Sequence, residues 1–446
     1  MMTNTENNNP RVPESLLSEI WKGQWVQRGP LPSSEGRIVR VRSPGTENRD
    51  SGPDFLSAVI TLDDEILEGD VELHVRSSDW HSHGHHRDPH FNGVILQVVL
   101  WDDAKRPACL ESGGTVPTVS LYNYLNGSLD ELSVRARAHP APPLPCKGAG
   151  TQLSKNTLLG ILDEHGKDRF YVKSASFEVS MVLEEPEQVL YQGIMGALGY
   201  TKNKKPFQEL AQHLPLRILE SFAGESRNPQ ATLQAVLLGA AGLLPSQCGH
   251  KSGLGNHAEI AGLETIWQSL NIKNPMNYSD WYFFRMHPKN FPSQRLLAAG
   301  CLLTNYLERG LLSGVLDLLQ KTTPDKPASI EKGFVIPGFI GRSRAREIVV
   351  NVVLPFGLAW AEVKSDYKLK EHVLELYKRY PRLSENQITR YLGQLFWGTQ
   401  KSDIDCAHLQ QGLIHLYKTF CQQQRCEPCP ISNALASAAA LDPESE

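Results

Sequence analysis

Two consecutive strands are predicted by residues 54–76, DFLSAVITLDDEILEGDVELHVR. An apolar run over 55–62 is followed by an Asp-Asp pair, which favours a turn. A second run over 66–76 alternates apolar and polar residues, as a half-buried strand does. Further strands are expected at 37–42 and at 94–101, and the latter is apolar enough to be buried on both faces. The N-terminal part of the chain is therefore expected to contain a sheet.

Beyond this region the apolar residues recur at helical spacing, which predicts helices over 156–166 and 186–198 among others. The predicted fold class is α+β, with a small mixed α/β module followed by a larger all-helical region. The expected divisions are a disordered lead-in at 1–12, the α/β module at 13–125, a Pro/Ala-rich linker at 126–155, a helical domain at 156–330, a helical domain with a cysteine cluster at 331–435, and a disordered tail at 436–446.

Composition limits the class of protein. The chain has 446 residues, of which 40% are hydrophobic and 21% charged, and these fractions suit a soluble globular protein. No apolar run approaches the ~18–20 residues of a membrane-spanning helix, and the polar N-terminus does not resemble a signal peptide. A cytoplasmic location without membrane contact is expected. The net charge of −4 argues against a protein that coats nucleic acid but permits a local basic channel.

The acidic residues of the two strands form the first candidate site. Residues two apart in a strand share a face, so Asp70, Glu72 and His74 are expected on one side. Asp54 begins the preceding strand, and the turn midway brings it beside Glu72. Two carboxylates make an oxygen site suited to Mg²⁺ or Mn²⁺. Such a metal activates water and stabilises the charge that develops on a phosphate.

Histidines are concentrated just after these strands. Six of the 15 histidines lie within residues 74–90. His81 and His83 directly follow an Asp-Trp pair, and we expect them to be metal ligands ahead of His85 and His86. The alternative is that these side chains form a solvated loop.

The acidic pattern resembles that of PD-(D/E)XK phosphodiesterases. A Gly-Pro pair followed by Asp54 matches the family's first acidic element, and Glu72-Leu73-His74 matches its acid-x-Lys element. Glu14 or Glu19 matches the acid that a preceding helix often supplies. The resemblance implies that Asp54, Glu72 and His74 are catalytic. Histidine replaces the usual lysine at position 74, where a neutral imidazole can position water, act as a base or bind metal.

A cysteine cluster near the C-terminus is the second candidate site. Cys421, Cys426 and Cys429 lie close together after a predicted helix, and Pro430 follows. The stretch resembles the iron–sulfur tail of helix-hairpin-helix DNA glycosylases, although it has three cysteines instead of four. Zinc and iron–sulfur clusters both need about four ligands. The candidates for the fourth are Cys406, His408 and His415. The alternative is a group of reduced thiols without metal.

Basic residues of the helical region are the third candidate site. We expect the phosphates of a nucleic acid to be bound by Arg285, Arg295, Arg342, Arg344 and Arg346. Arginines and aromatic rings stack on bases. The more ordinary interpretation of the aromatic run at 281–292 is a loop that anchors helices through buried rings.

Nearly the whole chain after residue 12 resembles a bacterial family known as a domain of unknown function. The resemblance is carried by residues 48–55, 69–74 and 78–83, among other stretches. Three functions are consistent with the sequence. The first is a metal-dependent phosphodiesterase acting on DNA or RNA. The second is a non-catalytic nucleic-acid-binding or scaffold protein. The third is a metal hydrolase of small substrates that uses Glu72, His74, His81 and His83.

Overall fold

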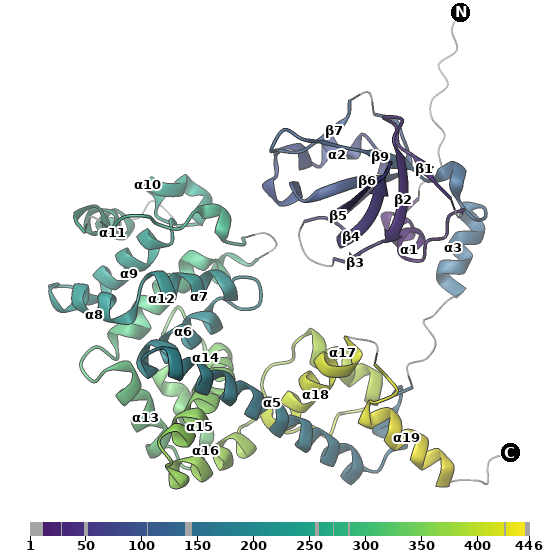
Figure 1. The fold of residues 1–446 in the computed structure, drawn as a ribbon. Coiled ribbons are helices and arrows are strands. Elements are labelled where there is room, and N and C mark those ends of the chain that lie inside the picture. The colour runs from purple at the N-terminus through teal and green to yellow at the C-terminus, as the bar shows by residue number, and fades with distance from the viewer. Residues whose placement is uncertain are drawn as a thin grey trace, which may run out of the picture. The chain divides into compact units, whose positions relative to one another are not determined.

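The chain divides into two compact units, unit 1 (Met1–Pro143) and unit 2 (Leu144–Glu446). Unit 1 carries the sheet and unit 2 is helical, which confirms the predicted α+β class (Figure 1). The computed structural model describes residues 12–27, 29–48, 52–104, 106–138, 145–254, 258–270, 272–283, 286–422 and 425–441.

Unit 1 is built on a mixed sheet with the strand order β1-β2-β4-β5-β6-β9, and β3 pairs with β4. β4 is antiparallel to β2 and β5, whereas β5, β6 and β9 are parallel neighbours. The strands of this sheet are β1 (Leu31–Pro32), β2 (Ile38–Ser43), β3 (Thr46–Glu47), β4 (Phe55–Leu62), β5 (Glu65–Arg76), β6 (Val94–Trp101) and β9 (Thr118–Ser120). A second, two-stranded sheet pairs β7 (Ala108–Cys109) with β8 (Thr115–Val116).

The β4–β5 hairpin sets the register of the site. Leu62 pairs with Glu65 across the two-residue turn, and Asp63 adopts a positive φ of 56° there. Short polar residues tolerate this conformation, and Asp63 Oδ1 also accepts a hydrogen bond from the Ile38 amide. At the other end of the hairpin, Phe55 pairs with Val71. Asp54 therefore enters the sheet opposite Glu72.

The two faces of β5 meet different surroundings. Val71 and Leu73 pack into a core with Leu17 and Ile20 of α1 (Glu14–Lys22). Period-two alternation turns Glu72 and His74 away from that core. The crossover from β5 to β6 consists of α2 (Asp79–Ser82) and the 3₁₀ turns His85–Arg87 and Pro89–Phe91. Unit 1 ends its described residues with the 3₁₀ turn Tyr122–Tyr124 and α3 (Leu129–Ala138).

Unit 2 consists of helices joined by short loops and 3₁₀ turns. Two helices continue as π-helical segments, Val349–Val353 after α14 and Tyr417–Cys421 after α18. The helices are α4 (Ala149–Gln152), α5 (Lys155–Leu183), α6 (Pro186–Leu198), α7 (Lys204–His213), α8 (Leu216–Gly224), α9 (Pro229–Ala240), α10 (Pro245–Cys248), α11 (Ala258–Ser269), α12 (Pro292–Thr304), α13 (Leu311–Lys321), α14 (Arg342–Ile348), α15 (Leu354–Val363), α16 (Tyr367–Arg379), α17 (Gln387–Trp397), α18 (Ala407–Leu416) and α19 (Pro430–Leu441).

The described residues of unit 2 form two hydrophobic cores. The larger contains buried residues from Phe170 to Ala407, and the smaller joins α4 and the start of α5 to α17, α18 and α19. Helices α5 and α18 approach closely because Gly412 faces the α5 backbone: a Cβ atom on Gly412 would lie 2.1 Å from the Leu162 carbonyl oxygen. Glycine at this position is therefore required by packing rather than by a turn.

The observed elements differ from the predicted divisions in several places. The segment 126–155, predicted as a linker, contains α3 and α4. The larger core of unit 2 extends across residue 330, where we expected a boundary between two helical domains. The predicted disordered tail at 436–446 was wrong for its first part, because α19 continues to Leu441. Of the lead-in at 1–12, all but Val12 lies outside the described residues.

One segment of unit 2, Pro229–Cys248, is long and apolar enough by composition to cross a membrane, which the sequence analysis did not anticipate. Buried residues make up 72% of its most apolar window. Leu233, Val236 and Leu237 of α9 pack in the larger core with α12. A core helix passes the same test of length and composition, and the burial of α9 is that of a core helix.

Candidate functional site

The structure brings the two predicted carboxylates together. The Asp54 amide donates a hydrogen bond to Glu72 Oε2 at 3.0 Å, and the Leu73 amide donates one to Asp54 Oδ2 at 2.9 Å. Each carboxylate is thus held by the backbone of the other's strand. Asp70 is not held in this way, since its Oδ1 accepts a hydrogen bond from the Ser57 amide at a bulge of β4. The hairpin register therefore selects Asp54 and Glu72 as the acidic pair.

Burial makes ionisation of this pair unfavourable. The pKa of Asp54 rises to about 7, mainly through burial and then through repulsion by Glu72. The pKa of Glu72 rises to about 8, again mainly through burial. Glu14 raises both values further, which identifies it, rather than Glu19, as the helix acid that faces the pair. A buried acidic pair of this kind is stabilised in its ionised form by a nearby cation.

A hydrogen-bond chain orients His74. Thr118 Oγ1 donates to Gln97 Oε1 at 3.0 Å, and Gln97 Nε2 donates to the Ser77 carbonyl at 3.3 Å. The same Nε2 lies 3.2 Å from His74 Nδ1. Because the Ser77 carbonyl can only accept, it fixes the orientation of the amide, and Nδ1 is then an acceptor. Neutral His74 therefore carries its proton on Nε2.

His74 is neutral at ordinary pH and points its Nε2 atom at the acidic pair. Burial, with repulsion from His85 and His83, lowers the pKa of His74 to about 3. Its Nε2 atom lies 3.7 Å from Glu72 Oε1 and makes no hydrogen bond with the described residues. The side chain is thus a buried N–H donor directed at the carboxylate site.

Two further histidines complete the group. His83 and His85 flank Gly84, whose positive φ of 81° reverses the chain between α2 and the following 3₁₀ turn. One nitrogen of each ring lies within 4.8 Å of the corresponding nitrogens of the others and of His74. His85 Nε2 also lies 3.2 Å from Glu72 Oε1, and burial lowers the pKa of His85.

His83, one of the two predicted histidine ligands, lies beside His74, whereas His81 does not, and His85 is the other histidine of this group. The His81 Nε2 atom lies 3.2 Å from the Pro107 carbonyl, and its ring packs against His86 with the centroids 4.8 Å apart. The turn at Gly84 explains the difference, since it rotates residues 83 and 85 toward His74. The glycine itself was the signal in the sequence that could have indicated this reversal.

The predicted fourth ligands of the cysteine cluster do not join it. Cys406 precedes α18, and its thiol interacts with Asp405 and the amides of His408 and Leu409 instead of with the other cysteines. His408 Nε2 is bonded to Asp163, at 2.9 Å from its carbonyl oxygen. His415 stacks on His165 with the ring centroids 5.5 Å apart. The cysteine that does approach Cys421, Cys426 and Cys429 is Cys146.

Two of the predicted arginines line one cavity of unit 2. Arg344 lies over the ring of Tyr200, with its guanidinium carbon 3.1 Å from the ring centroid, and Arg295 lies 5.0 Å from the same centroid. Burial lowers the pKa of Arg344 to about 10, and repulsion by Arg295 adds to this. The cavity has a volume of about 890 Å³, and its basic lining residues are Arg169, Lys173, Lys204, Arg295, Arg344 and Lys418.

The remaining predicted arginines are placed elsewhere. Arg346 forms an ion pair with buried Glu331 at 2.8 Å, so its charge is already neutralised. Arg342 is exposed at the start of α14, and it does not line the cavity of Arg344. Arg285 lies outside the described residues.

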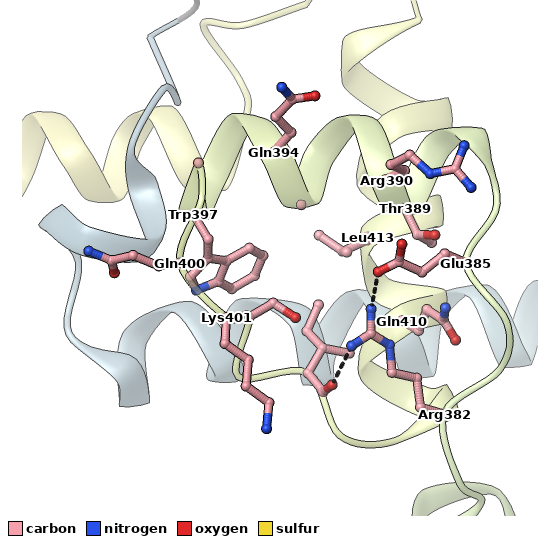
Figure 2. A pocket seen from close by; sticks show the side chains of 14 residues that line it. Arg382, Glu385, Thr389, Arg390, Gln394, Trp397, Gln400, Lys401, Gln410 and Leu413 are labelled. Carbon is pink, nitrogen blue, oxygen red and sulfur yellow. Dashed lines mark hydrogen bonds and ion pairs between the residues drawn. The ribbon is translucent and has the colours of Figure 1, made fainter.

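A separate cavity of about 390 Å³ lies over α17 (Figure 2). Its central guanidinium, that of Arg382, forms an ion pair with Glu385 and donates to the Ile404 carbonyl, as the dashed lines in Figure 2 mark. None of the predicted site residues lines it. This cavity is therefore distinct from the acidic pair, and it shares one lining residue, Glu385, with the Arg295–Arg344 cavity.

These observations describe a protein with a sheet unit that carries a buried acid–histidine site and a helical unit that carries a basic cavity. The chain belongs to the family described as "Protein of unknown function (DUF2851)", whose sequence profile matches residues 14–324. That match includes Asp54, Glu72 and the histidines but ends before Arg344 and the cysteine cluster. Neither the curated proteins nor the solved structures include a match to the chain.

Proposed function

We propose that this protein is a divalent-metal-dependent phosphodiesterase that acts on nucleic acid, with Asp54 and Glu72 as the metal ligands. The observation that carries the proposal is the interlocked pair of carboxylates, with half-buried Asp54 just before β4 and buried Glu72 in β5. Burial raises both pKa values, so a divalent cation would favour the ionised pair, and the oxygen atoms of the pair suit Mg²⁺ or Mn²⁺. A bound ion of this kind supplies Lewis-acid stabilisation of the charge on a phosphate.

The PD-(D/E)XK resemblance agrees with this assignment. Asp54 precedes β4, Glu72 lies in β5, and Glu14 of the first helix faces both, which is the order of acidic residues in that pattern. At the position where the pattern has lysine, His74 offers one N–H directed at the same site. A hydrogen bond from Nε2 to water or to a phosphate oxygen is the part of the lysine's role that a neutral imidazole can perform.

The Arg295–Arg344 cavity is the proposed contact with the phosphates of the substrate. Six basic side chains line it against two acidic ones, Glu347 and Glu385. The Arg295 and Arg344 guanidinium groups share the Tyr200 ring and repel each other, so an anion bound in the cavity near them is favourable. Binding at such a site weakens as salt rises, because phosphate contacts release counterions.

A second candidate function is hydrolysis of a small substrate at a transition metal. The observation that favours it is the group of three histidine nitrogens within 4.8 Å of one another, with Glu72 beside them. A metal on His74 Nε2 requires a proton on Nδ1, whereas Gln97 Nε2 faces that atom. The tautomer of His74 therefore favours the phosphodiesterase.

The proposal is tested by cleavage of labelled single- and double-stranded DNA and RNA with Mg²⁺ or Mn²⁺. We expect wild-type activity that is lost in Glu72→Gln and retained in the matched control Glu68→Gln, which changes an exposed acid of the same strand. Activity that survives in Glu72→Gln would contradict the assignment of the site. Salt-dependent binding without cleavage would instead support the non-catalytic alternative. A transition metal that stays bound through purification and is lost in His85→Ala would support the second candidate.

A further inference from the structure

Three of the eight cysteines, Cys146, Cys421 and Cys429, pack in the smaller core of unit 2, and Cys426 lies in the turn that precedes Cys429. Of these four cysteines, three follow α18 in the sequence, and the fourth, Cys146, comes from the start of the unit, before α4. Cys146 interacts electrostatically with Cys429 and Cys426, and Cys421 interacts with all three others. All four thiols are free of disulfide bonds. The grouping joins two segments of the chain that are 275 residues apart (421 − 146).

The backbone around Cys146 is tied to α17. The Gly148 amide donates to the Leu395 carbonyl at 2.9 Å, and the Ala149 amide donates to the Cys146 carbonyl at 3.2 Å. Gly150 permits close contact here, since a Cβ atom on it would lie 2.6 Å from the indole of Trp397. These contacts hold the Cys146 thiol at a defined place in the core.

The C-terminal cysteines are held by local turns. Cys421 ends the π-helical extension of α18. The Cys429 amide donates to the Cys426 carbonyl at 3.1 Å, which closes a tight turn between these two cysteines. The Asn433 amide then donates to the Cys429 carbonyl and connects the turn to α19. A Cys-x-x-Cys turn of this kind directs two thiols to one side and is common among metal ligands.

The burial of these thiols is consistent with ligand roles. Cys146 and Cys429 each expose 6% of their surface, and Cys421 and Cys426 are half-buried. Thiophilic metals bind cysteines as thiolates, and binding releases the thiol protons.

We propose that this group of four cysteines binds an iron–sulfur cluster. The ligands are Cys146, Cys421, Cys426 and Cys429. Four cysteine thiolates are the usual ligand set of a [4Fe–4S] cluster. The same set could bind one zinc ion, but a tetrahedral zinc with Zn–S bonds of about 2.3 Å needs sulfur atoms about 3.8 Å apart. Among the described residues, no three cysteine sulfurs lie within 4.8 Å of one another. A [4Fe–4S] cluster does not require sulfur atoms this close together, because its four cysteine ligands bind different iron atoms.

Such a cluster would crosslink the beginning and the end of unit 2. It is independent of the acid–histidine site, which belongs to unit 1. The core that it would stabilise contains Leu153 and Leu158 from one end and Ile431 and Leu435 from the other. We therefore assign the cluster a structural role in holding α19 against α4 and α5.

The experiment is metal analysis of the full chain purified without oxygen. Iron, acid-labile sulfide and zinc are measured per chain, together with the visible absorbance of the cluster. The variants Cys146→Ser and Cys426→Ser test the ligands, and the second places its serine at a half-buried position, where the cost to folding is smaller. Cys406→Ser is the matched control, because Cys406 was a predicted ligand that does not belong to the group of four. Cys301→Ser controls for serine in a buried position outside the group.

We expect about four iron and four sulfide per wild-type chain. Both, and the visible absorbance, should be lost in Cys146→Ser and Cys426→Ser and retained in the two controls. One zinc per chain, or no metal at all, would overturn the proposal of a cluster. Wild-type iron content in Cys146→Ser would overturn the assignment of the fourth ligand. Circular dichroism of each variant establishes that the helices remain folded, so that loss of iron is assigned to the missing thiol.

Discussion

Metal binding at Asp54 and Glu72 should depend steeply on pH, because the ion must displace protons from a buried pair. The pKa values of about 7 for Asp54 and about 8 for Glu72 mean that both carboxyl groups are protonated below pH 7. In that range each unit of pH should raise the affinity about 100-fold, since two protons leave. Between pH 7 and pH 8 one proton leaves and the gain is about tenfold. Above pH 8 the affinity should reach a plateau.

The expected change from pH 6 to pH 8 is therefore about 1,000-fold for Mn²⁺. His74 and His85 contribute little to this slope. Burial lowers the pKa values of His74 and His85 below their ordinary value of 6.5, so both rings are already neutral in most of this range. The carboxyl pair is thus the group whose titration the measurement follows.

The assay is a titration of the metal-free protein with Mn²⁺ at pH 6, 7, 8 and 9. The electron paramagnetic resonance signal of the free ion reports how much Mn²⁺ is unbound at each step. Glu68→Gln should reproduce the wild-type curve, because residue 68 is exposed on the same strand. Glu72→Gln should bind Mn²⁺ more weakly, and the slope of its log affinity against pH should be smaller by about one, since one proton fewer is released. Equal wild-type affinity at pH 6 and pH 8 would refute the reasoning, since it would mean that these carboxyl groups do not gain or lose protons on binding.

Three further results are expected. The metal-free protein should lose stability as pH rises from about 4 to about 8, because the carboxyl groups of Asp54 and Glu72 ionise at lower pH in the unfolded chain than in the folded protein. Glu72→Gln should therefore unfold at a higher temperature than wild type at pH 8 but not at pH 4, as measured by calorimetry. Gly412→Ala should destabilise unit 2 by about 1–3 kcal/mol in urea unfolding, because the methyl group meets the α5 backbone, whereas Gly393→Ala, with open space around its Cβ, should stabilise it by about 0.5–1 kcal/mol. Arg344→Ala should weaken nucleic-acid binding and reduce the slope of log affinity against log salt concentration by about one, the contribution of one phosphate contact. Arg342→Ala should change neither quantity. Equal effects of the two substitutions would contradict the role of the cavity.

Local patterns in the sequence identified much of the sheet unit. The predicted strands at 55–62 and 94–101 coincide with β4 and β6, because continuous apolar runs bounded by turn residues leave little freedom in where a strand begins. The helix at 186–198 was likewise predicted to the residue, with Pro186 marking its start. The approach of Asp54 to Glu72 was also predictable, since a short hairpin determines which residues face each other.

Helix lengths were less predictable. α5 extends to Leu183, whereas apolar periodicity predicted a helix that ends at residue 166. Its second half exposes Val172, Val179 and Val182, so the pattern of a buried face is weak there. A long helix of this kind is stabilised by the elements that pack on its other side, and these come from distant parts of the chain.

Local sequence was enough to predict the strands, the facing acids and the chemical types of the candidate ligands, because each depends on residues close together in the chain. Tertiary structure alone decided that His85 rather than His81 faces His74, and that Cys146 rather than Cys406 joins the cysteine cluster. The first choice depends on a chain reversal at Gly84, and the second on packing between the two ends of unit 2. Contacts across hundreds of residues leave no local pattern, because they are set by the way the helices pack around a shared core.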